Sequence, residues 1–386
     1  MKTYKKEEVW TISFAHLCHD IFSSFLAPIL PLLIERLGIS LSMASFLDIA
    51  RKIPSLFNPL LGLMAERRDV KYFVIITPAI TAISMCLLGV TSSYFVAIFL
   101  LFIAGISATL FHIPSPTMIK IASGEQTGKG MSYFMVGGES ARTIGPLIVT
   151  GAISLWGFEG IYKLLPIGIF SSLFLYYKLK NFQVKEFSAK KVKIKNISTK
   201  EILKELSSFF IILGGYLLLN AGTKSAITLY LPVYLTKHNF SIYEAGISLS
   251  VLQFFGIVGT FFSGRFSDKI GRKNMLFISA LGTTLGVLLF IYFNKIALFP
   301  ILAFLGFFLF APGPVMLATV QDTNSSKPTF VNSLYMGINF GISSVVVFLV
   351  GYLSDIYGLD RAYLISALFT FLSMFVILLL PINKKA

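Results

Sequence analysis

The sequence predicts an all-α polytopic membrane protein with twelve transmembrane helices in two pseudo-symmetric six-helix bundles. Composition, a regular succession of apolar segments and an internal repeat support this prediction. Of the 386 residues, 55% are hydrophobic and only 13% are charged, and the mean hydropathy is +0.79. About a quarter of the residues in a typical soluble domain are charged. The chain is therefore too apolar to cover a globular domain with a water-soluble surface.

Apolar segments of membrane-spanning length fill nearly the whole chain. A helix needs about 20 apolar residues to cross a bilayer. The first segment is long and lacks a small-residue cleavage site, so we expect a span there and no signal peptide. Paired prolines predict kinks in spans 1, 2, 4 and 10. The expected spans are 10–35, 42–65, 72–91, 93–121, 130–155, 161–179, 207–236, 242–264, 274–294, 296–320, 329–354 and 361–381.

The positive charge predicts orientation and excludes a nucleic-acid partner. The net charge is +15, but 24 of the 33 Lys/Arg residues lie on the side of the termini and only five on the opposite side. An excess of Lys/Arg marks the cytoplasmic side of a membrane. Both termini should therefore be cytoplasmic, and a lysine-rich linker at 181–206 should separate the bundles 1–180 and 207–386.

The two halves share residues at a nearly constant offset of 200–202 positions, which predicts a duplicated six-helix unit. Transporters are often built from such repeats, with the substrate site near the membrane midplane between them. The matched pairs are Gly62/Gly264, Glu66/Asp268, Pro114/Pro314, Gly137/Gly337, Gly151/Gly351, Glu159/Asp360 and Tyr162/Tyr363.

The stretch "GRFSDKIGRK" at 264–273 resembles the loop signature of the major facilitator superfamily between spans 8 and 9. An ordinary cytoplasmic loop explains its basic residues, but not the glycine and aspartate spacing. The resemblance implies a conformational latch, in which charged contacts between helices close the cytoplasmic side. Its residues here are Gly264, Asp268, Gly271, Arg272 and Lys273, with a first-half copy at Gly62, Glu66, Arg67 and Arg68 that lacks the second glycine.

Two further stretches resemble the fosmidomycin-resistance branch of this superfamily, which consists of efflux proteins in bacteria and relatives in archaea. They are "SFAHLCHDIFSSFLAPILPLL" and "FHIPSPTMIKIASGEQTGKGMSYFMVGGESARTIGPLI". The matching positions are His16, Asp20, Phe111, His112, Gly137, Gly138, Gly145 and Pro146. The departures are Ile113, Glu139 and Ala141, together with the charges Asp48, Arg51, Lys52 and Arg142.

Ionisable residues inside spans predict a proton-coupling site. A charge at the bilayer centre costs about 2.5–3.5 kcal/mol on insertion scales, so each one suggests a function. His16 and Asp20 lie four residues apart, on one helical face. We expect Asp20 to exchange a proton with His16 as relay, and Glu139 and His112 to take part. A structural His–Asp pair that fixes the packing of span 1 is the alternative.

Cations inside other spans predict a site for an anion. Asp48 can neutralise one of Arg51 and Lys52 and leave the other free. An arginine can bind carboxylate or phosphonate oxygens through two hydrogen bonds. The alternative is that the arginines pair with carboxylates across helices. The expected substrate-binding residues are Arg51, Lys52, Arg142, Lys224, His19 and Asp48.

Span 5 carries small residues at a spacing of four, at Gly137, Ala141 and Gly145, and Pro146 follows. Such a stripe lets helices approach closely. It loosely resembles the span-5 motif of proton-driven antiporters in this superfamily, which favours export. Ordinary helix packing is the alternative.

No enzyme motif is present. The sequence lacks a GxxxxGK[ST] loop and an HExxH helix, and Cys18 and Cys86 lie in apolar segments. We therefore expect no cofactor, no metal site and no disulfide.

The expected function is proton-coupled export of a small anionic molecule or drug by alternating access. We expect a monomer in the cytoplasmic membrane of a prokaryote, whose partners are its substrate, protons and lipids. The alternatives are import of a metabolite anion and, in another class, a non-transporting sensor or scaffold. A sensor or scaffold would be expected to carry an additional soluble domain or long structured loops, and the sequence shows neither.

Overall fold

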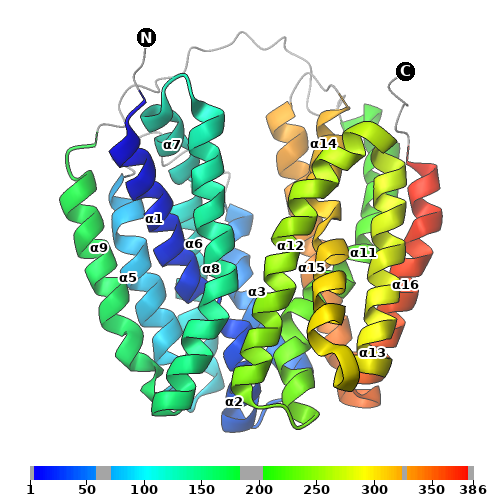
Figure 1. Ribbon diagram of the computed structural model, residues 1–386, viewed down its shortest axis with the longest axis horizontal. Coiled ribbons are helices and arrows are strands. Elements are labelled where there is room, and N and C mark those ends of the chain that lie inside the picture. The colour runs from blue at the N-terminus through cyan, green and yellow to red at the C-terminus, as the bar shows by residue number, and fades with distance from the viewer. Residues whose placement is uncertain (1–3, 58–70, 183–202, 324–327, 381–386) are drawn as a thin grey trace. The chain divides into compact units, whose positions relative to one another are not determined.

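The computed structural model describes residues 4–57, 71–182, 203–323 and 328–380, and within these ranges the only regular elements are helices (Figure 1). The chain divides into two compact units. Unit 1 comprises Met1–Ile39, Met43–Ala189 and Pro232–Ser250; unit 2 comprises Ser40–Ser42, Lys190–Leu231 and Val251–Ala386. The all-α class is confirmed, whereas the bundle boundaries expected at 180 and 207 stay a prediction.

The first half of the chain forms ten of the described helices. They are α1 (Lys6–Ser23), α2 (Leu26–Leu37), α3 (Leu41–Lys52), the 3-10 helix η1 (Ile53–Phe57), α5 (Lys71–Leu87), α6 (Tyr94–His112), α7 (Ser115–Ser123), α8 (Thr127–Trp156), η2 (Glu159–Leu164) and α9 (Leu165–Leu179).

The second half forms longer helices. They are α11 (Ser207–Lys237), α12 (Ile242–Ile270), α13 (Arg272–Phe310), α14 (Pro312–Gln321), α15 (Pro328–Tyr357) and α16 (Leu359–Leu379). Helix α13 contains a kink at Ala297, where the backbone leaves the helical region. Two of the expected spans, 274–294 and 296–320, therefore meet within it.

Nine helical segments in the described part of the chain are long and apolar enough to cross a membrane. They correspond to nine of the twelve expected spans. The expected third span is α5, which has only 17 residues. The expected fifth span is α8, whose middle carries Glu139 and Arg142. The expected second span begins with α3 and continues into 58–70, outside the described residues, so the count of twelve stays a prediction.

Proline interrupts the helices where paired prolines predicted kinks. α6 ends at His112 and α7 begins at Ser115, on either side of Pro114. α13 ends at Phe310 and α14 begins at Pro312. Likewise α1 and α2 are separate helices, and α3 gives way to a 3-10 turn that contains Pro54. A proline inside a helix removes one backbone hydrogen bond and clashes with the preceding turn, which explains these breaks.

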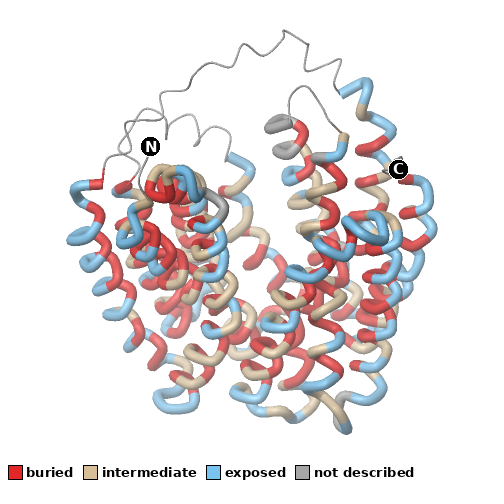
Figure 2. The backbone as a smooth tube through the Cα atoms, turned by 45° about the horizontal axis from the view of Figure 1, so that its top comes forward, coloured by how far each residue is buried: buried red, intermediate tan, exposed pale blue. Residues whose placement is uncertain are grey.

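The exposed side chains are consistent with a lipid environment. Phe95, Leu155 and Ile211 are 79%, 76% and 74% exposed. In water such large apolar side chains would be unfavourable, whereas lipid tails accept them. Figure 2 shows buried and exposed positions alternating along the helices, because each helix packs one face and leaves another uncovered.

Helix α1 is the centre of unit 1. It packs most extensively against α8 and also contacts α5, α6, α7 and α9, as Figure 1 shows. Val9, Ile12 and Ala15 of α1 join Phe111 of α6 and Phe134 of α8 in one buried cluster. The position of α1 is thus determined by side chains from several neighbouring helices.

Glycines on α8 permit its close contact with α1. A Cβ at Gly145 would lie 2.7 Å from the backbone oxygen of Ile21. A Cβ at Gly137 would lie well under 3.0 Å from the backbone oxygen of Ser13. At these two positions glycine leaves space for the backbone of α1, whereas the functional role of the small-residue stripe stays a prediction.

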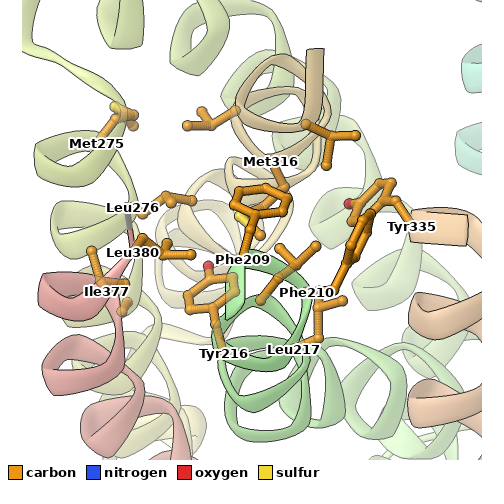
Figure 3. Packing of buried hydrophobic residues seen from close by; sticks show 14 of the residues in the cluster. Phe209, Phe210, Tyr216, Leu217, Met275, Leu276, Met316, Tyr335, Ile377 and Leu380 are labelled. Carbon is orange, nitrogen blue, oxygen red and sulfur yellow. The ribbon is translucent and has the colours of Figure 1, made fainter. Parts of the chain in front are cut away.

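Unit 2 has an apolar core of its own (Figure 3). Phe209 and Tyr216 from α11 pack with Leu276 from α13, Met316 from α14 and Ile377 from α16. All five side chains are at least nine-tenths buried. With Val331 and Tyr335 of α15, this core joins five helices.

Substitution of Gly137 by alanine should destabilise the protein, because the new methyl group meets backbone that cannot rotate away. Overpacking of this kind costs about 1–3 kcal/mol. The matched control is Gly151→Ala on the same helix, where a Cβ meets nothing within 4 Å. Alanine there should be neutral or slightly stabilising. Thermal unfolding of the two variants in detergent measures the difference, and equal midpoints would contradict the close contact of α1 and α8.

Candidate functional site

A buried carboxylate surrounded by imidazoles lies in the last turn of α1. Asp20 is 4% exposed, and its carboxylate contacts three histidines. His19 Nδ1 lies 2.8 Å from Oδ1, His16 Nε2 lies 3.3 Å from Oδ2, and His112 Nε2 of α6 lies 3.3 Å from Oδ1. These four residues are called the Asp20 cluster below.

Helix α8 holds the His16 ring in place. His16 Nδ1 lies 2.7 Å from the backbone oxygen of Phe134, and the two rings stack at 4.0 Å. A Cβ at Gly138 would lie within 3.0 Å of the His16 ring, so only glycine leaves space for it. A carbonyl oxygen accepts but cannot donate a hydrogen bond. His16 Nδ1 therefore carries a hydrogen, and Nε2 faces Asp20.

This orientation gives the cluster an acid–base role. A neutral His16 with its hydrogen on Nδ1 has a lone pair on Nε2, which would face a negative carboxylate oxygen. The contact becomes favourable when a proton lies between the two groups, on either the imidazole or the carboxylate. The geometry thus favours a bound proton at the His16–Asp20 contact, and it fits both the coupling and the structural interpretation of the pair.

The four members of the cluster differ in exposure. His16 and His19 are 5% and 0% exposed, whereas the His112 side chain is 41% exposed. His112 is therefore the most exposed member of the Asp20 cluster. His19 is fully buried and supports the Asp20 carboxylate at 2.8 Å, so its expected contact with substrate stays a prediction.

A second group of charges lies at the end of α3. The Asp48 carboxylate contacts both Arg51 Nη2 at 3.0 Å and Lys52 Nζ at 2.5 Å. The expectation that one of these cations is left free is therefore wrong, because one carboxylate is shared by both. Arg51 also donates to the backbone oxygen of Ser23 at 2.8 Å. The three side chains carry a net charge of about +1, and both cations are partly exposed.

Glu139 and Arg142 form a pair within α8, with 3.2 Å between Oε1 and Nη1. Asp48 and Glu139 thus each pair with an arginine of the same helix, and among the described residues neither carboxylate pairs with an arginine of another helix. Lys224, on α11 in unit 2, lies 4.2 Å from the centre of the Phe310 ring. Glu139 and Arg142 are both partly exposed.

The stretch that resembles the family signature is a tight turn between helices. α12 continues to Ile270, Gly271 adopts φ = 92°, and α13 begins at Arg272. Only glycine adopts this backbone conformation without strain. Gly264 lies within α12, where the nearest neighbour of an added Cβ would be Pro314, at 3.9 Å.

Arg272 connects charges from two elements of unit 2. Its guanidinium lies 2.6 Å from Asp268 Oδ1 and 3.2 Å from Asp322 Oδ2, which follows α14. Lys273 Nζ donates to the backbone oxygen of Leu378 at 3.1 Å. Charged contacts between helices are therefore present at this turn, and their role as a conformational latch stays a prediction. The first-half copy, Gly62, Glu66, Arg67 and Arg68, lies outside the described residues.

Sequence reasoning missed two parts of the Asp20 cluster. It proposed His112 as a coupling residue but had no signal for its contact with Asp20, since the two lie on different helices. It also missed the Phe134 carbonyl, because any residue type can supply a backbone oxygen. Of the packing residues, Gly137 and Gly145 contact α1, Ala141 is fully buried, and Pro146 lies within α8.

The chain is similar over nearly its full length to bacterial transport proteins. It is 24% identical over 379 residues to the fosmidomycin resistance protein of Escherichia coli (strain K12), covering 97% of this chain and 92% of that protein. It is 21% identical, with the same coverage, to the uncharacterized MFS-type transporter YfnC of Bacillus subtilis (strain 168). The multi-drug resistance efflux pump PmrA of Streptococcus pneumoniae (strain ATCC BAA-255 / R6) is 24% identical over 270 residues, 66% of each chain.

Solved structures share the fold. A bacterial homolog of the human lysosomal transporter Spinster, inward-facing and occupied, has a TM-score of 0.81 at 12% identity, covering 98% of this chain and 97% of that one. A D-xylose–proton symporter has a TM-score of 0.75 at 14% identity, covering 97% of both chains. The family model described as Major Facilitator Superfamily matches residues 12–347. The chain therefore belongs to the major facilitator superfamily and is a multi-pass membrane transporter, with relatives named as efflux and drug-resistance proteins.

Proposed function

We propose that this protein is a proton-coupled antiporter that exports a small anionic molecule by alternating access. It works as a monomer in the cytoplasmic membrane of a prokaryote, with both termini in the cytoplasm. The names of its relatives support export and drug resistance. The observation that carries proton coupling is the contact of His16 Nε2 with the buried Asp20 carboxylate.

The Asp20 cluster takes up and releases the coupled proton. Asp20 and His16 are buried, so the proton enters through the half-exposed His112. A gain or loss of charge inside an apolar bundle changes the relative free energies of the conformations of the protein. This difference links protonation to the transport cycle. Glu139, which is partly exposed, is a second group that can exchange a proton.

Cations on α3 and α8 bind the anion. Arg51 and Lys52 share one carboxylate, so their positive charge is only partly neutralised. The Arg142 side chain is 49% exposed and can present two N–H groups to a phosphonate or carboxylate. Lys224 in unit 2 is a further candidate. Fosmidomycin is a phosphonate, which makes it the first substrate to test.

Proton-coupled import of an anion is the second candidate, and the charge pairs favour it. Asp48 and Glu139 pair with the same cations that are proposed to bind substrate. Protonation of these carboxylates would release the cations for an anion, so that proton and anion bind together. Export requires that the two ligands are carried in separate steps of the cycle. Vesicles of known orientation with an imposed pH gradient distinguish the two directions.

Substitution of Asp20 by asparagine should abolish transport driven by a pH gradient, because the amide cannot exchange a proton. Fosmidomycin binding, measured by thermal shift in detergent, should remain. Uptake of fosmidomycin into proteoliposomes with imposed gradients measures the effect. The control is Ser13→Ala on α1, which removes a buried hydroxyl that bonds within the helix. A variant that still transports with the same pH dependence would disprove the assignment of Asp20.

Replacement of Arg142 by lysine should weaken fosmidomycin binding about tenfold, since lysine keeps the charge but loses the two-pronged geometry. Arg361→Lys, at an exposed position in the first turn of α16, is the control and should bind as the unmodified protein does. Calorimetric titration in detergent gives both affinities. Equal affinity in the two variants would show that Arg142 does not bind the anion.

A further inference from the structure

The Asp20 cluster brings together donor atoms that suit a metal ion. One donor atom each from His16, Asp20 and His112 lies within 4.8 Å of the other two. We propose that these three side chains bind a divalent transition-metal ion, with Zn²⁺ as the preferred ion, in competition with the coupled proton. The proposal extends the proposed function at the same cluster, and its test is a binding measurement that needs no transport.

The distances are close to those that zinc requires. Zn–N bonds of about 2.0–2.1 Å and Zn–O bonds of about 2.0–2.2 Å place neighbouring tetrahedral ligands about 3.3–3.5 Å apart. The His16 Nε2–Asp20 Oδ2 and His112 Nε2–Asp20 Oδ1 distances are both 3.3 Å. The two histidines face different oxygens of the carboxylate, so an ion bound through one oxygen requires His112, the more exposed partner, to move closer to that oxygen and to His16.

Two ligands already have the outer contacts that are typical of a metal site. Histidines that bind metals usually donate their other ring N–H to a carbonyl or carboxylate, which directs the remaining nitrogen to the ion. His16 Nδ1 donates to the Phe134 carbonyl at 2.7 Å in this way. His19 Nδ1 lies 2.8 Å from Asp20 Oδ1 and orients the carboxylate. A metal ion would also remove the unfavourable contact between a lone pair of His16 and the carboxylate.

The donor set determines which ions fit. Two imidazoles and one carboxylate suit Zn²⁺ and the neighbouring transition metals, whereas Mg²⁺ and Ca²⁺ prefer oxygen ligands throughout. Three protein ligands leave the fourth tetrahedral position for a further ligand such as water, and His112 is the exposed member of the set. Because the ligands must be free of protons, acidification should release the metal.

Calorimetric titration of metal-stripped protein in detergent with ZnCl₂ tests this site. One ion should bind per chain at pH 7.5, and lowering the pH to 6 should weaken binding at least tenfold. MgCl₂ should not compete. Titration with CoCl₂ should produce the strong visible absorption of four-coordinate Co²⁺, which reports the geometry directly.

His112→Ala and the conservative His112→Gln should each weaken Zn²⁺ binding at least tenfold, and their thermal midpoints without metal verify folding. The matched control is His238→Ala, since His238 is the remaining histidine of the chain and bonds to the Tyr234 carbonyl within α11. It should bind zinc as the unmodified protein does. Three results would overturn the proposal. They are an unchanged zinc affinity in both His112 variants, a loss of zinc binding in His238→Ala, and no zinc binding by the unmodified protein.

Failure of the metal site and failure of proton coupling give different results. If the unmodified protein binds zinc and the Asp20→Asn variant keeps pH-driven transport, the metal site is supported and coupling at Asp20 is disproved. Transport that is lost in Asp20→Asn while the unmodified protein binds no zinc supports coupling and disproves the metal site.

Discussion

The burial of the Asp20 carboxylate is the constraint on which the rest of unit 1 depends. A charged group in an apolar interior is strongly unfavourable unless it is paired and hydrogen-bonded. Three imidazoles supply this compensation, and each must be held within reach of the carboxylate. The glycines of α8 let this helix approach α1, and its Phe134 carbonyl then directs His16 towards Asp20. The geometry of the Asp20 cluster therefore depends on the close packing of α1 and α8.

The two units differ in what their interiors contain. The core of unit 2 is formed by aromatic and aliphatic side chains such as Phe209 and Met316 (Figure 3), and its charged contacts at Arg272 lie at the junction of α12 and α13. In unit 1 the described residues include a cluster of four ionisable side chains around Asp20, beside an apolar core. Three of the four histidines of the chain lie in the Asp20 cluster of unit 1. Both units thus have apolar cores, and the buried histidines are in unit 1.

The spans and their breaks could be predicted because they depend on local properties. Length and hydropathy determine a span, and paired prolines predicted the breaks at Pro54, Pro114 and Pro312, whereas Pro78 and Pro146 lie inside continuous helices. The His16–Asp20 contact was predictable for the same reason, since both residues lie on one helix. The contact of His112 with Asp20 was not, because it depends on how α6 is rotated about its axis. The sharing of Asp48 between Arg51 and Lys52, and the complete burial of His19, likewise depend on side-chain placement that spacing does not determine.

A cluster that holds a proton between a carboxylate and an imidazole has the atoms that a divalent cation needs. A proton adds one positive charge to the Asp20 cluster, whereas a divalent ion adds two and ties α1 to α6 through His112. The ion would therefore stabilise one arrangement of these helices more strongly than a proton does. A transporter cycle requires that the bound ligand leave again, so a tightly bound metal would hold unit 1 in a single arrangement. The exposure of His112 makes such locking less favourable, because the partly exposed imidazole of His112 can move away from the ion more easily than the buried His16 and Asp20.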